Sequence, residues 1–280
     1  MNSQIIRILF YNAIFAGIGI YLIRTFFNTQ YNSYVLFLLL LGLVFFDCLI
    51  GKKKLSAYGI KKPRKQDLKF ALMIFAVFFP ISIASRVLFP NFDALYANVL
   101  GLQYSSLFKF LIFSVPIVIL IEEVGTRSLF QSKLSSVFNR RFAIYAAIIN
   151  FTLLHFTWAF SLDFLNFSIT FSTVFIYSIF LALLFDYTKN IFSTIVVHIL
   201  VNITSSFQII FHIYNQFSYE MILWGLWGIL FIAFFPQSIS FLKRAFTSSR
   251  GKIKTISEKT LLILFSAFSL ITIIFVNYFL

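Results

Sequence analysis

The chain has 280 residues, of which 60% are hydrophobic, 20% are aromatic and only 11% are charged. Because soluble domains carry about 25% charged residues, this composition excludes an ordinary soluble protein and predicts an integral membrane protein. The net charge of +14 is typical of nucleic-acid binding in a soluble chain, but here the basic residues gather between apolar segments, so we expect no nucleic-acid partner. The single cysteine, Cys48, excludes an intramolecular disulfide and a cysteine-rich zinc site.

Nine apolar segments follow one another along the chain, and each has about 20 residues, the length of a membrane-spanning helix. They predict an all-α polytopic membrane protein of about 8–9 transmembrane helices, in a single integral membrane domain over residues 1–280. We interpret the first segment as a retained helix rather than a signal peptide, because eight further apolar segments follow it. The segments are 5–26, 31–50, 68–89, 107–132, 142–161, 167–187, 191–213, 219–241 and 260–280.

Lysine and arginine concentrate in the linkers that an alternating arrangement of nine helices places on one side of the membrane. The largest groups lie in 51–69 and 242–259, and smaller ones lie at 133–141, at Lys189 and at Arg7. The positive-inside rule then predicts a cytoplasmic N-terminus and basic loops in contact with anionic lipid. A composition rich in phenylalanine, isoleucine and lysine indicates a bacterial cell membrane.

The fourth apolar segment contains three charged residues, Glu122, Glu123 and Arg127. A charge near the bilayer centre costs at least ~2.5–3.5 kcal/mol, so three such groups within six residues indicate a structural or functional role. On an α-helix, Arg127 lies about 40° around the axis from Glu123 but about 140° from Glu122. We therefore predict an ion pair between Glu123 and Arg127, with Glu122 left free for chemistry.

Two further segments carry polar residues at a similar depth. His155 lies in the fifth segment, and His198 and Asn202 lie one helical turn apart in the seventh. At ~1.5 Å per residue, Glu122 lies roughly 15 Å from the inner end of its helix, His155 roughly 20 Å, His198 roughly 10 Å and Asn202 roughly 16 Å. All four fall in the middle of a hydrocarbon core ~30 Å thick, so we expect them to share one site.

Three motifs appear in order on these helices: Glu-Glu-x-x-x-Arg at 122–127, Phe-x-x-x-His at 151–155 and His-x-x-x-Asn at 198–202. This ordered set resembles the CPBP family of intramembrane proteases, also known as the Abi or CAAX-protease group, which includes the type II prenyl-protein endopeptidases. The resemblance covers roughly residues 105–215 and implies that helices four to seven form a catalytic core. It implies an intramembrane endopeptidase acting on a membrane-embedded peptide or protein, which need not be prenylated.

Hydrolysis of a peptide bond needs an activated water, a stabilised oxyanion and a proton donor for the leaving amine. Glu122 is the best candidate for the general base, and His155 can share the water and return a proton to the amine. His198 and Asn202 lie on one helix face and can bind the oxyanion, a role typically worth ~3–4 kcal/mol per donor.

Glu123 and Arg127 would fix the backbone and the electric field around the general base. A metal version uses the same site differently: Glu122, His155 and His198 would bind zinc, which lowers the pKa of its bound water to ~7. The compact His-x-x-x-His spacing of zincins is missing from the sequence. The sequence alone leaves both versions open: the site either works without a cofactor or binds zinc.

Two other functions compete with proteolysis. The first is a non-catalytic membrane partner, such as a bacteriocin self-immunity protein, which the family also contains, or a scaffold for a surface-display enzyme. That function predicts that Glu122→Gln leaves the phenotype intact. The second is a proton-coupled transporter that uses the same glutamates and histidines as a relay, for which we expect paired broken helices that the sequence does not show.

Overall fold

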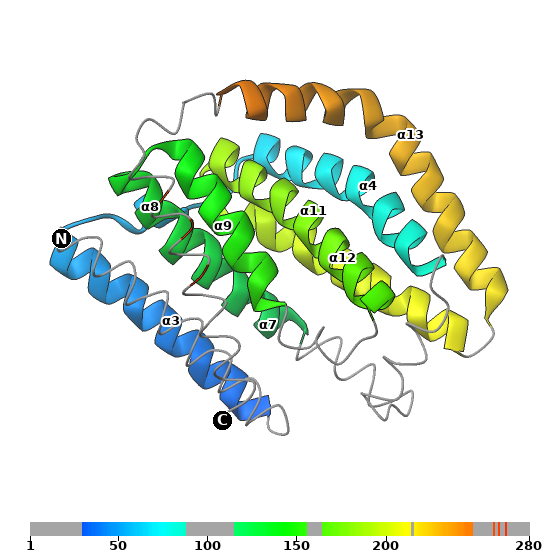
Figure 1. Cartoon of the computed structure of the whole chain (residues 1–280), viewed down its shortest axis with the longest axis horizontal. Helices are drawn as coiled ribbons and strands as arrows, with labels where there is room; N and C mark the ends of the chain where they lie inside the picture. Colours follow the sequence, from blue (N-terminus) through cyan, green and yellow to red (C-terminus); the bar gives the residue numbers. More distant parts are fainter. Residues whose placement is uncertain are drawn as a thin grey trace.

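The computed structural model of the chain describes residues 30–87, 115–155, 164–213 and 216–248, together with the single positions 260, 263 and 267. These residues form helices joined by short loops, and no strand occurs among them, which confirms the predicted all-α class. In chain order (Figure 1) the elements are α3 (Gln30–Gly51), η2 (Leu55–Tyr58), α4 (Lys65–Val87), α7 (Val115–Glu123), η4 (Val124–Gln131), α8 (Ser132–Val137), α9 (Arg140–Leu154), α11 (Phe164–Thr188), α12 (Ile191–Ile213) and α13 (Phe217–Ser248).

The helices follow the apolar segments of the sequence, because each segment has the length and the side chains that a membrane helix needs. α12 coincides with the predicted 191–213, and α3 differs from the predicted 31–50 by one residue at each end. The total of 8–9 helices stays a prediction, since 5–26 and all but three positions of 260–280 lie outside the described residues. Within the described ranges, the helices that are long and apolar enough to cross a membrane are Phe167–Thr188, Ile191–Gln208 and Phe217–Thr247.

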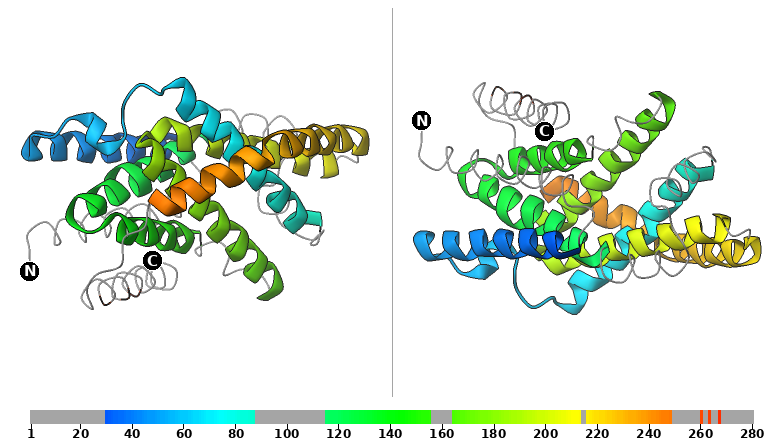
Figure 2. Two further views of the ribbon diagram at one scale, coloured as in Figure 1. Left: turned by 90° about the horizontal axis from the view of Figure 1, so that it is seen from above. Right: turned by 90° about the horizontal axis from the view of Figure 1, so that it is seen from below.

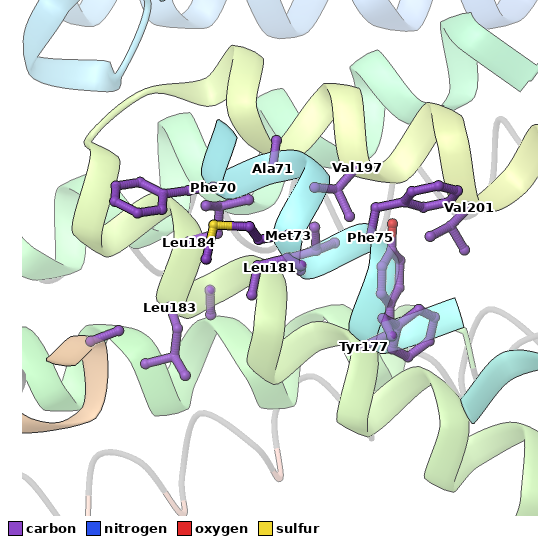
Figure 3. Packing of buried hydrophobic residues seen from close by; sticks show 14 of the residues in the cluster. Phe70, Ala71, Met73, Phe75, Tyr177, Leu181, Leu183, Leu184, Val197 and Val201 are labelled. Atoms are coloured by element: carbon purple, nitrogen blue, oxygen red, sulfur yellow. The ribbon is translucent and has the colours of Figure 1, made fainter. Parts of the chain in front are cut away.

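The largest hydrophobic core lies where α4, α11, α12 and α13 meet, and Figure 3 shows part of it between these helices. Phe70 of α4 packs on Phe241 of α13 with 4.6 Å between the ring centroids, a favourable tilted aromatic pair. Buried side chains from the two central helices, among them Leu181 of α11 and Val197 of α12, complete it. This core fixes the helix that carries His198.

A second core joins α3, α7 and α12. It contains Leu40 and Val44 of α3, Ile117 and Ile121 of α7, and Ile195 of α12, all buried. The helix that ends in the glutamate pair is thereby held between α3 and α12. α3 lies on one flank of the bundle, and α13 lies on the opposite flank (Figures 1 and 2).

The outward faces of these two flanking helices are apolar, as expected of surfaces that meet lipid. Leu38 and Leu49 of α3 and Ile229 and Ile232 of α13 are all exposed. α13 bends midway along its length (Figure 1), and Pro236 inside the helix explains the bend, because proline removes a backbone hydrogen bond and clashes with the preceding turn. The two halves of α13 together cover α4.

Three buried aspartates tie the helices together at one end of the bundle. Each lies near a helix end and binds basic or polar side chains, most of them from other elements. The groups are Asp47 with Tyr58 and Lys133, Asp67 with Arg64 and Asn190, and Asp186 with Arg140 and Lys189. The linkers after α3, α8 and α11 therefore meet at the same end, as the predicted alternation of helices requires. The side of the membrane that this end faces stays a prediction.

Candidate active site

Glu122 and Glu123 lie at the junction between α7 and η4, an eight-residue π-helix that directly continues α7. The sequence predicts a regular α-helix through this stretch, so the wider π turns are a difference that the structure reveals. The hydroxyl of Thr126 donates to the carbonyl oxygen of Glu122 (2.5 Å), and the hydroxyl of Ser132 donates to that of Arg127 (3.1 Å). The Thr126 bond has the spacing that regular α-helices also show, whereas the Ser132 bond spans five residues, and π turns are frequent at functional sites.

Glu123 and Arg127 form the predicted ion pair, with 3.5 Å between Arg127 Nε and Glu123 Oε2. Both side chains are completely buried. The guanidinium carbon of Arg127 also lies 5.1 Å from the centre of the Phe151 ring on α9, a cation–π contact. Because an unpaired charge in an apolar interior is very costly, the two charges offset each other and fix the backbone beside Glu122.

His198 of α12 lies between the two glutamates. Its Nδ1 atom is 2.9 Å from Glu123 Oε1, and its Nε2 atom is 3.5 Å from Glu122 Oε2. His155, directly after α9, approaches the other oxygen of Glu122, with 3.9 Å between Nε2 and Oε1. Its Nδ1 atom lies 2.9 Å from the carbonyl oxygen of Phe151, one turn earlier. The structure therefore brings Glu122, His155 and His198 together, and Glu123 with them.

The hydrogen bonds define how the imidazoles can exchange protons with Glu122. A carbonyl oxygen only accepts, so His155 donates from Nδ1 to Phe151 and its Nε2 atom faces the carboxylate. His198 has the same arrangement, because its Nδ1 atom meets the carboxylate of Glu123. The site thus places two carboxylates, two imidazoles and one guanidinium side by side, the kinds of group that acid–base chemistry uses.

The site has a buried half and an accessible half. The side chains of Glu123 and Arg127 have no exposed surface, and that of His198 is 3% exposed. The side chains of Glu122 and His155 are each 19% exposed. Glu122 and His155 are therefore the accessible members of the group, while the other three side chains lie within the bundle.

Asn202, the fourth residue predicted for the site, lies on α12 one turn after His198 and is partly buried. Its carbonyl oxygen accepts a hydrogen bond from the hydroxyl of Ser206 (2.7 Å), while its side-chain amide forms no hydrogen bond with any residue in the described ranges. The structure places Asn202 on the helix face of His198 without bringing it into contact with the glutamates.

The zinc version requires Glu122, His155 and His198 to act as ligands. Within the part of the chain that the structure describes, no three His, Cys, Asp or Glu side chains are arranged to hold a metal ion. The arrangement as it stands does not fit a three-ligand site, so the chemistry below uses the side chains alone. The involvement of zinc stays a prediction that a chelator tests.

One residue beside the site is not predicted from the sequence, Tyr177 of α11. Its ring stands 5.2 Å from the His198 ring and nearly perpendicular to it, at 80°. It is buried, with 6% of its surface exposed. The only signal in the sequence is that Tyr177 and Ser178 interrupt a long apolar part of α11, which is too common a pattern to indicate a site.

The three motifs fall within a stretch that is similar to a known family. No curated protein and no solved structure matches the chain. Residues 103–204 match the family model of the Rce1-like proteins, described as type II CAAX prenyl endopeptidase Rce1-like. The match covers less than half of the chain, and with the apolar helices it identifies an integral membrane protein. The predicted resemblance to the CPBP, or CAAX-protease, group is therefore confirmed for residues 103–204.

Proposed function

We propose that the chain is an intramembrane endopeptidase that hydrolyses a peptide bond in a membrane-embedded peptide or protein. One observation carries the proposal: the two oxygens of Glu122 face two imidazole nitrogens, Nε2 of His198 at 3.5 Å and Nε2 of His155 at 3.9 Å. These separations are longer than typical direct hydrogen bonds, so the facing atoms keep the capacity to bind a water molecule or a substrate group that lies beside them. The similarity to an endopeptidase family supports the same chemistry.

In this scheme Glu122 takes a proton from a water molecule, and the hydroxide attacks the carbonyl carbon of the scissile bond. His155, on the accessible side, receives this proton from Glu122 on its Nε2 atom and gives it to the nitrogen of the leaving amine as the C–N bond breaks, which returns both side chains to their starting state. His198, protonated on both nitrogens, donates from Nε2 to the oxyanion, and Asn202 donates from its amide. Each such donor is typically worth ~3–4 kcal/mol of transition-state stabilisation.

Glu123 and Arg127 support this chemistry without touching the substrate. Glu123 accepts the hydrogen bond from His198 Nδ1, which aims the opposite nitrogen at the site. Arg127 compensates the charge of Glu123, so that this carboxylate stays a hydrogen-bond acceptor in an apolar interior. The pair therefore fixes both the orientation of His198 and the electric field at Glu122.

The proposed setting is a bacterial cell membrane, with the N-terminus in the cytoplasm and anionic lipid against the basic loops. Lys52, Lys53 and Lys54 are exposed at the end of the bundle where the three buried aspartates are already paired. Their positive charges are thus left for lipid headgroups, an attraction of about 1 kcal/mol per basic residue near an anionic surface.

The test compares peptide termini in membranes and culture medium from three strains: a deletion strain, the wild type, and Glu122→Gln expressed at an equal level. We expect at least one terminus that the wild type produces and the other two strains lack. Glu220→Gln, the same chemical change in the first turn of α13, is the matched control and should retain that terminus. If Glu122→Gln restores every wild-type phenotype and terminus, the glutamates are structural. The function as a non-catalytic membrane partner is then the better explanation.

A second arm of the experiment concerns the metal. The purified protein is incubated with the identified substrate, with and without a zinc chelator. Unchanged cleavage supports the scheme of side chains alone, while loss of cleavage that added zinc restores would show that the reaction needs zinc, with Glu122, His155 and His198 as its candidate ligands. Neither result affects the assignment of the protein as an endopeptidase.

A further inference from the structure

His198 is held in a corner between two aromatic rings. The ring of Phe151 lies 5.8 Å away at an angle of 60°, and the ring of Tyr177 lies 5.2 Å away at 80°. These two rings are themselves 6.3 Å apart and steeply inclined, at 71°. The contact with Tyr177 is edge-on and the contact with Phe151 is tilted, and aromatic contacts of both kinds are favourable and depend on orientation. The imidazole plane is therefore set by its neighbours as well as by its hydrogen bonds.

Of the two rings, only Tyr177 can be examined separately from the rest of the site. Phe151 also packs against His155 in a tilted pair, with 4.6 Å between ring centroids, and lies under the guanidinium of Arg127. Replacing Phe151 would therefore disturb three side chains at once. Tyr177 packs against His198 on one side and against Phe78 of α4 on the other (4.5 Å), at the edge of the core seen in Figure 3.

The position of Tyr177 is well fixed. The hydroxyl of the next residue, Ser178, donates to the carbonyl oxygen of Ile148 (3.3 Å), which joins α11 to α9 at this level. The Tyr177 hydroxyl is buried and forms no hydrogen bond with any residue that the structure describes. The contact with His198 therefore comes from the ring and not from the hydroxyl.

We propose that Tyr177 is a positioning residue, whose ring edge keeps the imidazole of His198 aligned between Glu123 and Glu122. The torsion that orients an imidazole ring is broad, so a ring without lateral support can rotate. A half-turn of His198 would replace Nδ1 with a carbon opposite Glu123 and remove Nε2 from Glu122. The inference rests on the proposed function for its role in catalysis, but the alignment itself can be measured without a substrate.

The experiment uses nuclear magnetic resonance of the purified full chain with ¹⁵N-labelled histidine. The chain has three histidines, so the signals of His198 are assigned with His155→Gln and His212→Gln. We expect the wild type to show one form of His198 with a hydrogen-bonded proton on Nδ1. Tyr177→Phe keeps the ring and should preserve this signal. Tyr177→Leu removes the ring and should abolish the signal or split it into two forms.

Tyr187→Leu is the matched control, because it makes the same change ten residues later on α11. Tyr187 packs against Phe70 and Phe241, away from the histidines, so the His198 signal should not change. Unchanged His155 and His212 signals in Tyr177→Leu show that the variant has folded, and Tyr177→Met replaces it if it has not. The proposal is overturned if Tyr177→Leu or Tyr177→Met leaves the His198 signal intact, or if Tyr177→Phe abolishes it.

Failure of this proposal and failure of the endopeptidase assignment give different results. If the protein is not a protease, the His198 signal still reports whether Tyr177 aligns the ring. If it is a protease, Tyr177→Leu should lower kcat with little change in KM, since Tyr177 orients His198 and does not bind substrate. A variant that loses the signal but keeps full kcat would show that the alignment has no catalytic role.

Discussion

The buried ion pair between Glu123 and Arg127 allows stability and activity to be separated. Glu123→Gln removes one charge and leaves Arg127 unpaired in a site with no exposed surface. Breaking a buried pair in this way costs about 3–5 kcal/mol, whereas replacing both partners with apolar or neutral residues of similar volume is often neutral. We therefore expect Glu123→Gln to be strongly destabilised, and Glu123→Gln/Arg127→Met to recover most of the loss.

Activity should behave differently from stability in this pair of variants. The double variant still lacks the carboxylate that accepts from His198 Nδ1, so it should remain inactive although it is folded. Thermal unfolding of the purified protein gives the stability, and Cys48, the single cysteine, allows it to be followed with a thiol-reactive dye. A double variant as unstable as Glu123→Gln would refute the electrostatic reasoning, and a fully active double variant would refute the role of Glu123.

Three further predictions concern the end of the bundle where the basic linkers meet. Gly59→Ala should lower the free energy of unfolding by roughly 1–3 kcal/mol, because the added Cβ would lie 2.5 Å from the Phe185 ring and φ is +75° at this residue. Gly51→Ala, whose added Cβ has no contact closer than 3.5 Å, is the control in the same thermal unfolding experiment. Burial raises the pKa of Asp67, but hydrogen bonds from Arg64 outweigh it and hold the pKa below its ordinary value. The contribution of Asp67 to stability is thus present above pH ~4 and lost as pH falls through the lowered pKa, a dependence that Asp67→Asn should remove. Replacing the lysines at 52–54 with glutamine should weaken binding of the detergent-purified chain to vesicles containing phosphatidylglycerol but not to neutral vesicles, and equal loss from both would contradict an electrostatic contact.

The helices could be predicted from the sequence because each is an apolar run of about 20 residues, a pattern that few other structures produce. The ion pair could also be predicted, since Glu123 and Arg127 are four residues apart and local geometry alone brings them together. Similar depths for Glu122, His155 and His198 followed from counting residues along their helices. Each of these predictions needs only the sequence of a single helix: its length, the spacing of two residues on it, or the distance of a residue from its end.

The rest could not be predicted, because it depends on how helices turn toward one another. His198 meets Glu123 across 75 residues of chain, and nothing in the spacing indicates which imidazole nitrogen faces which glutamate. The π-helix over Val124–Gln131 changes the backbone pattern within a continuous helix, which apolar periodicity does not reveal. The sequence offers several basic residues as possible partners for Asp186. Only the packing of the helices determines that Arg140, at the start of α9, is one of its partners.

The division of the site into a buried and an accessible half has a consequence for catalysis inside a membrane. Charges that face lipid are costly, so a site that must keep two carboxylates near the bilayer centre needs a permanent counter-charge out of reach of the substrate. Arg127 supplies it to Glu123 from the fully buried side. Glu122 has no such buried cation as its close partner and instead faces two imidazoles. The charges of Glu123 and Arg127 thus offset each other in the interior, and Glu122 is the more exposed of the two carboxylates.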